Sequence, residues 1–139
     1  MNINRFTQKS LQAVQDCEKI AMEYGNQEIC QEHLFYALLT QEDGLILKMM
    51  EKMGLDKNYV ANRAEQAVAK RPKVQGGQAF VGQDLNKVLI HAEDEMKQMG
   101  DEYVSVEHLF LALLKYPSRE MKELFREMGI SKEGFLQAL

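Results

Sequence analysis

The chain has 139 residues, a formal net charge of −4, 45% hydrophobic residues and 27% charged residues. These values fit one ordinary globular domain or two very small ones, and they exclude a disordered chain. The longest apolar runs, 34–39 and 109–114, are six residues each, against the ~20 that a membrane helix needs. Because no apolar signal segment begins the chain, we expect a cytoplasmic location and no membrane partner.

The distribution of charge argues against nucleic acid as a partner. Residues 1–75 carry ten basic and ten acidic side chains, and residues 76–139 carry seven and eleven. Neither half offers the broad basic excess that neutralising a phosphate backbone requires.

An internal duplication dominates the sequence. When the chain is shifted by 75 positions, residues 6–62 align with 81–137 without a gap, and 13 of the 57 pairs are identical. The strongest match joins QEHLFYALL (31–39) to VEHLFLALL (106–114). Such self-similarity indicates two copies of one structural unit.

Helical signals recur at matching places in the two copies. Glycines at 25, 54, 100 and 129 follow apolar stretches, as helix-ending glycines do. Short polar residues suited to N-caps precede the stretches: Thr7, Asp43, Asp56, Ser118 and Ser131. In chain order the predicted helices are 8–24, 32–41, 45–53, 57–69, 83–99, 107–115, 119–128 and 132–138.

The pattern predicts an all-α fold of eight helices, built as a pseudo-twofold duplication of a four-helix repeat. The first repeat covers 1–70, a Pro- and Gly-containing loop covers 71–82, and the second repeat covers 83–139. Apolar residues recur every three or four positions in the fifth helix, including Leu85 and Leu89. The second and sixth helices are apolar almost all round, so we expect them to be the central, most buried elements.

No catalytic motif appears in the sequence. There is no Gly-Lys dipeptide, so the phosphate-binding loop of ATPases is missing and neither enzymatic activity nor a cofactor is expected of this chain. The soft metal ligands are few: Cys17, Cys30, His33, His91 and His108. The cysteines align with Ala92 and Ser105, which favours small residues in tight positions over a metal site or a disulfide.

One dipeptide, Glu-His, recurs at the start of a helix in both copies, as Glu32-His33 and Glu107-His108. A structural interpretation is available, because Glu favours a helix N-terminus and His there can bond a neighbouring backbone group. Alternatively, the two Glu residues mark two equivalent binding positions for cationic groups.

Together these motifs resemble one family. The Arg5-Phe6-Thr7-Gln8 start, the two EHLFxALL helices, the Met-Gly elements and the RPKVQGG linker resemble the Clp N-terminal repeat domain of Hsp100 AAA+ chaperones, in particular its ClpB disaggregase branch. The resemblance covers essentially the whole chain and stops before any ATPase module, so an isolated N-domain is expected.

The resemblance implies a domain that binds unfolded or aggregated polypeptides, and in some branches adaptor proteins, above a hexameric ATPase ring. Matching the client-binding positions of the family gives Thr7, Gly82, Leu85, Leu89, His91, Glu95, Asp101, Glu107 and His108. On this interpretation an apolar client segment lies beside Leu85 and Leu89, and the acids favour flanking basic residues.

The related ClpC branch suggests an alternative. Its N-domains recognise phosphoarginine through a Glu in each repeat, and both equivalents, Glu32 and Glu107, are present here. A carboxylate suits a guanidinium, and helix N-terminal amides suit a phosphate. Thr7 could assist at the first site by its side chain, whereas its counterpart Gly82 could not.

Overall fold

A computed structural model describes residues 3–139, which fold almost entirely into helices. The elements in chain order are the 3-10 turn η1 (Ile3–Arg5), α1 (Gln8–Glu23), β1 (Glu28–Ile29), α2 (Gln31–Leu39), α3 (Leu45–Lys52), α4 (Lys57–Ala69), β2 (Phe80–Val81), α5 (Gln83–Gln98), α6 (Val106–Lys115), α7 (Arg119–Met128) and α8 (Lys132–Ala138). All eight predicted helices are confirmed, with ends within two residues of those expected. In the described part of the chain, no helix is long and apolar enough to cross a membrane.

Most of the predicted N-caps are confirmed. Side-chain oxygens accept bonds from first-turn amides at four of the five positions: Thr7, Asp56, Ser118 and Ser131. The prediction was wrong for Asp43, because Gly44 is the N-cap of α3. Asp43 instead adopts a left-handed backbone with φ of 55°, and its carboxylate lies 2.7 Å from Lys48 Nζ.

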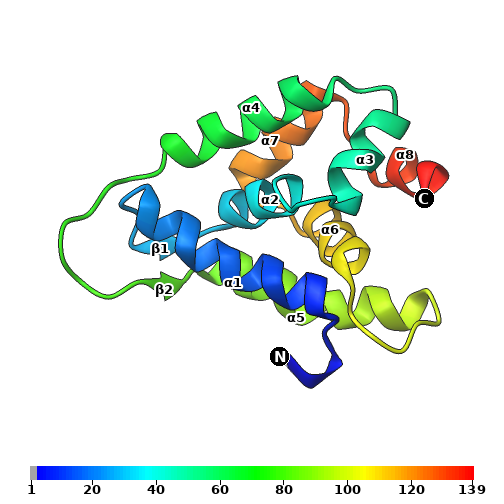
Figure 1. Ribbon diagram of the computed structural model, residues 1–139, viewed down its shortest axis with the longest axis horizontal. Helices are drawn as coiled ribbons and strands as arrows, with labels where there is room; N and C mark the ends of the chain where they lie inside the picture. The colour runs from blue at the N-terminus through cyan, green and yellow to red at the C-terminus, as the bar shows by residue number, and fades with distance from the viewer. Residues whose placement is uncertain (1–2) are drawn as a thin grey trace.

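The two central helices are α2 and α6, as predicted (Figure 1). Helix α2 packs against α1, α3, α4, α5 and α6, and α6 packs against α1, α2, α3, α5 and α8. Figure 1 shows this pair between α1 and α5 on one side and α4 and α7 on the other. In α2 every residue except Tyr36 is buried, and in α6 every residue except Glu107 and the last two is buried. Neighbouring elements therefore cover both helices on nearly every side.

Two short parallel pairings, which leave no periodic signal in the sequence, join the two copies. Strand β1 pairs with β2, with Ile29 opposite Val81, and an isolated bridge joins Phe6 to Val104. These two pairs are related by the 75-residue shift of the duplication. The segment before the first helix of each copy therefore lies against the segment before the second helix of the other copy.

Candidate functional site

Because of these two parallel pairings, the residue that caps the first helix of each repeat, Thr7 or Gly82, lies against the other repeat. The Thr7 amide donates to the Val104 carbonyl at 2.9 Å, and Ser10 Oγ donates to the same carbonyl at 2.6 Å. Thr7 therefore lies beside the approach to α6, which carries Glu107. It does not lie in the first-repeat site with Glu32, where the sequence analysis had placed it.

Gly82 takes the corresponding place near the start of α2. Its amide donates to the Ile29 carbonyl at 2.9 Å. A Cβ atom added to Gly82 would stand 2.5 Å from Glu28 Oε2, so the glycine accommodates a close carboxylate. The two junctions thus share a backbone arrangement and differ in the side chains they present.

The two histidines of the Glu-His pairs have matching structural roles. His33 Nδ1 accepts a bond from the Cys30 amide at 2.8 Å, and His108 Nδ1 accepts one from the Ser105 amide at 2.9 Å. This confirms the structural interpretation of the histidines. Because Nδ1 accepts, the proton resides on Nε2 of each ring.

The second ring nitrogen of each histidine also has an equivalent partner. His33 Nε2 lies 2.9 Å from Asn26 Oδ1, and His108 Nε2 lies 2.7 Å from Asp101 Oδ2. Asn26 and Asp101 are themselves related by the duplication. The second copy therefore presents an exposed carboxylate, oriented by His108, where the first copy has a buried amide.

The structure separates the predicted client-binding residues by burial. Leu85, Leu89, Glu95 and His108 are each at most 4% exposed, so the apolar pair belongs to the core. Gly82 is also buried. The predicted residues that reach the surface are Thr7, His91, Asp101 and Glu107.

Three of these, Thr7, Asp101 and Glu107, frame a surface that sequence analysis did not identify in full. Tyr103, which is 55% exposed, lies between Asp101 and Glu107 in sequence. The turn η1 lies against the same segment, because Arg5 Nε donates to the Glu102 carbonyl and the Val104 amide donates to the Arg5 carbonyl. Ile3 in this turn and Met99 at the end of α5 add exposed apolar side chains. We call Ile3, Thr7, Met99, Asp101, Tyr103 and Glu107 the α6-start surface.

The contacts of His91 are with residues outside the α6-start surface. Its ring stacks on Tyr116 with centroids 4.2 Å apart, and its Nδ1 lies 2.8 Å from Asp94 Oδ2. Tyr116 follows α6, so His91 packs near the end of this helix and not near its start.

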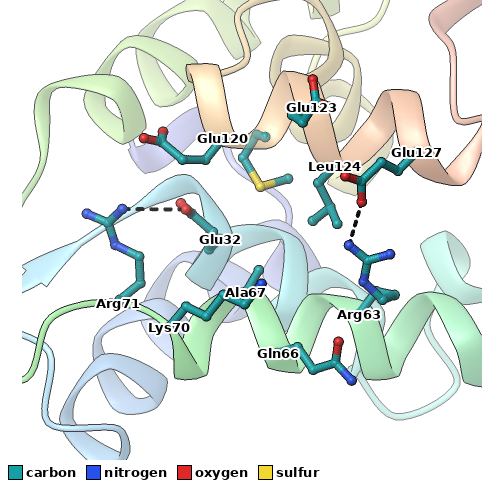
Figure 2. Close-up of a pocket in the computed structure, with 11 residues that line it drawn as sticks. Glu32, Arg63, Gln66, Ala67, Lys70, Arg71, Glu120, Glu123, Leu124 and Glu127 are labelled. Atoms are coloured by element: carbon teal, nitrogen blue, oxygen red, sulfur yellow. Dashed lines mark hydrogen bonds and ion pairs between the residues drawn. The ribbon is translucent and has the colours of Figure 1, made fainter.

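Glu32 differs sharply from its counterpart Glu107. Its side chain is 5% exposed, and its Oε2 lies 3.6 Å from Arg71 Nη1 (Figure 2). Burial raises the pKa of Glu32 above its ordinary value, although a bond from its own backbone and the Arg71 charge oppose that change. A guanidinium from the inter-repeat loop thus already lies beside the carboxylate that the phosphoarginine hypothesis requires.

Glu32 and Arg71 lie at one end of a cleft of about 350 Å³ between α4 and α7. Figure 2 shows α4 contributing Arg63, Lys70 following the end of α4, and α7 contributing Glu120, Glu123 and Glu127. An Arg63–Glu127 pair, with Nη2 and Oε2 2.6 Å apart, bridges the two helices. Opposite charges therefore face each other across this cleft and largely compensate one another.

Neither cysteine is placed for chemistry. Cys17 and Cys30 are both buried and free, and burial raises the thiol pKa of each, that of Cys30 to about 12. Within residues 3–139, no group of three or more His, Cys, Asp or Glu side chains could hold a metal ion.

Comparison with known proteins agrees with the duplication and the fold. The family model described as the Clp repeat (R) N-terminal domain matches residues 5–128. The whole chain is 43% identical to the chaperone protein ClpB of Nitratidesulfovibrio vulgaris and 37% identical to that of Clostridium perfringens. It spans 17% of the length of each of these relatives.

Solved structures share the same fold at lower identity. The Hsp104 N-terminal domain from Candida albicans superposes with a TM-score of 0.83 at 20% identity, covering 96% of this chain and 87% of that one. A ClpV N-domain, solved in complex with a VipB peptide, gives 0.73 at 20% identity, covering 98% and 89%. With the family match and the ClpB identities, the chain belongs to the Clp repeat N-terminal domain family.

Proposed function

We propose that this chain is the client- or adaptor-binding N-terminal domain of a ClpB-like, ATP-dependent disaggregase. It binds exposed segments of unfolded or aggregated polypeptides and passes them to a hexameric ATPase ring. Family membership supports this proposal, as does the relative whose N-domain was solved with a peptide. ATP and Mg²⁺ act in the ring, since this chain lacks the Gly-Lys pair of a phosphate-binding loop.

The observation that carries the proposal is the composition of the α6-start surface. Tyr103 exposes an aromatic ring and lies in sequence between Asp101 and Glu107, whose carboxylates also reach the surface. An apolar client side chain can pack on the ring, while basic residues flanking it pair with the acids. Each contact is weak alone, but a hexameric ring presents several copies of the domain, so avidity compensates.

The proposal is tested by amide chemical-shift titration of the isotopically labelled chain with a permanently unfolded, carboxymethylated polypeptide. We expect shifts at Thr7, Asp101, Tyr103 and Glu107. Tyr103→Ala should weaken binding about three- to tenfold, because loss of an aromatic contact costs on the order of 1 kcal/mol. Glu107→Gln should reduce any preference for clients with basic flanks.

Tyr59→Ala provides the matched control, because Tyr59 is 47% exposed on α4 and its side chain contacts Arg63 of the same helix. It should leave client affinity unchanged. Equal losses in the two tyrosine variants, or no loss in either, would remove the α6-start surface as the client site. Leu89→Asp is unsuitable here, since this side chain is buried and its replacement would unfold the domain.

Phosphoarginine recognition is the second candidate, and Arg71 beside Glu32 is the observation that bears on it. A ligand guanidinium at Glu32 has to displace Arg71, whereas Glu107 is half-buried and follows Val104, to which the Thr7 amide donates. If the candidate is correct, free phosphoarginine shifts amides near Glu107 first, and Glu107→Ala abolishes that response. A calorimetric titration without heat at millimolar ligand would exclude this function.

A further inference from the structure

A second groove on the molecule carries a concentration of positive charge. It has a volume of about 570 Å³ and lies where the beginning of α5, the end of α6, α7 and the beginning of α8 meet. We call it the basic groove, and its principal residues are Lys87, Lys115, Tyr116, Lys122, Arg126 and Lys132.

The charge of this groove opposes that of the chain. Five Lys or Arg residues line it with a single acid, Asp84, although the chain as a whole has 17 basic and 21 acidic residues. Glu123 pairs with Arg126, and Glu95 Oε1 lies 3.6 Å from Lys132 Nζ. Among the described residues, no carboxylate lies within ion-pair distance of Lys87, Lys115 or Lys122.

The aromatic ring of Tyr116 lies close to two of these lysines, which have no carboxylate partner in the described part of the chain. The ammonium groups of Lys87 and Lys115 lie 5.3 and 5.6 Å from the centroid of the half-buried Tyr116 ring. Leu114, Phe125 and Ile130 add apolar lining to the same groove. Its walls therefore offer unpaired ammonium groups and apolar surface within one concave site.

We propose that the basic groove binds an acidic peptide segment that alternates carboxylates with apolar side chains. Carboxylates of the peptide pair with Lys87, Lys115 and Lys122, and an apolar side chain of the peptide packs against Tyr116 and the apolar lining of the groove. A long nucleic acid is a poorer occupant, because the net charge of −4 over the chain repels an extended polyanion.

This site does not rest on the proposed function and has the opposite charge preference. Lys87 is near the beginning of α5, whereas Asp101 follows its end, so the helix separates the basic groove from the α6-start surface by about 16 Å at 1.5 Å per residue. A single client could occupy both sites only with a basic and an acidic stretch in succession.

The test is an amide chemical-shift titration of the 139-residue chain with an unlabelled ten-residue peptide in which glutamate alternates with leucine. Shifts should gather at residues 84–87, 114–117 and 122–132. Lys87→Glu/Lys122→Glu should weaken binding about tenfold, since two favourable surface charge contacts become repulsive.

Lys19→Glu/Lys97→Glu is the matched control, because both lysines are exposed outside the groove and the change in net charge is the same. This variant should bind the acidic peptide with unchanged affinity, and circular dichroism verifies that both variants are folded. A lysine-leucine peptide should not bind in the groove.

Several outcomes would overturn the proposal. They are an equal loss of affinity in the control variant, equal binding of the lysine-leucine peptide, equal binding of an all-glutamate peptide, and no shifts at millimolar peptide. Tighter binding of a ten-nucleotide single-stranded RNA at the same residues would assign the groove to nucleic acid instead.

Discussion

Phe35 and Phe110 occupy equivalent positions in the two repeats, and their rings stack against each other with centroids 6.0 Å apart. Both side chains are fully buried, and each also meets Phe125 edge-on. Residues related by a twofold operation can contact each other only near its axis. The pseudo-twofold axis therefore passes between α2 and α6, and the core of one repeat continues into that of the other.

We predict that Phe35→Ala and Phe110→Ala each lower the free energy of unfolding by about 3–5 kcal/mol, as truncation of a buried phenylalanine does. Because the rings touch, the double variant should depart from additivity by about 0.5–1.5 kcal/mol. Urea denaturation measures all three values. Phe80→Ala, at a side chain 52% exposed, should cost less than about 0.5 kcal/mol. Strict additivity would mean that the stacked contact contributes nothing of its own.

The two aspartates predicted as caps should respond differently to replacement. Asp56 accepts bonds from the amides of Asn58 and Tyr59, so Asp56→Ala should cost about 1 kcal/mol of stability. Asp43 has an exposed ion pair with Lys48 and a left-handed backbone that Ala disfavours, so the matched variant is Asp43→Gly, which removes the side chain without that strain and should cost less than about 0.5 kcal/mol. Thermal and urea unfolding of the two variants provide the comparison, and a larger loss at Asp43 would contradict the assignment of Gly44 as the cap.

Sequence periodicity predicted the helices and the central position of α2 and α6 because these depend on local patterns. The same periodicity placed Leu85 and Leu89 on one apolar stripe of α5, and both are in the core. Family resemblance assigned these two residues to a client surface as well. The helical stripe is confirmed, because both side chains are buried, and the client-surface assignment stays a prediction.

Long-range relationships were beyond the sequence analysis. The pairing of Phe6 with Val104 and of Ile29 with Val81 joins residues far apart in the chain, and two-residue strands leave no periodic signal. The sequence predicts only that Arg71 lies in a loop, because the position of a loop side chain depends on how that loop packs. Its contact with Glu32 therefore emerged only from the structure.

Arg71 should stabilise the domain through its contact with Glu32. Arg71→Met leaves a buried carboxylate without its cation, so we expect a loss of about 1–2 kcal/mol at pH 7. Burial already raises the pKa of Glu32, and removing Arg71 raises it further. A group with a raised folded-state pKa costs stability as the pH rises through that value, so the deficit should shrink at acidic pH.

Lys70→Met is the appropriate control for that variant. Lys70 is an exposed cation lining the same cleft and makes no ion pair among the described residues. Its replacement removes the same charge and should change the unfolding free energy by less than about 0.5 kcal/mol at any pH. Parallel losses in the two variants, measured by urea denaturation between pH 5 and pH 7, would show that net charge matters and the Glu32 contact does not.

His33 should make the stability of the domain depend on pH. Burial, and secondarily the Arg71 charge, lower the pKa of His33 from 6.5 to about 4. Its Nδ1 accepts the Cys30 amide, so the folded state requires a neutral ring. As the pH falls below 6.5 the unfolded chain takes up a proton that the folded chain refuses, and stability is lost progressively until about pH 4.

His33→Gln isolates this effect, because glutamine at the third helical position can still bond the Cys30 amide but does not titrate. Between pH 7 and pH 5 the wild-type chain should lose about 1–2 kcal/mol more stability than His33→Gln. Contributions from Glu32 and the other carboxylates are common to both proteins and cancel in the difference. If the two unfolding free energies run parallel over this range, protonation of His33 does not oppose folding, and burial of the ring does not hold it neutral.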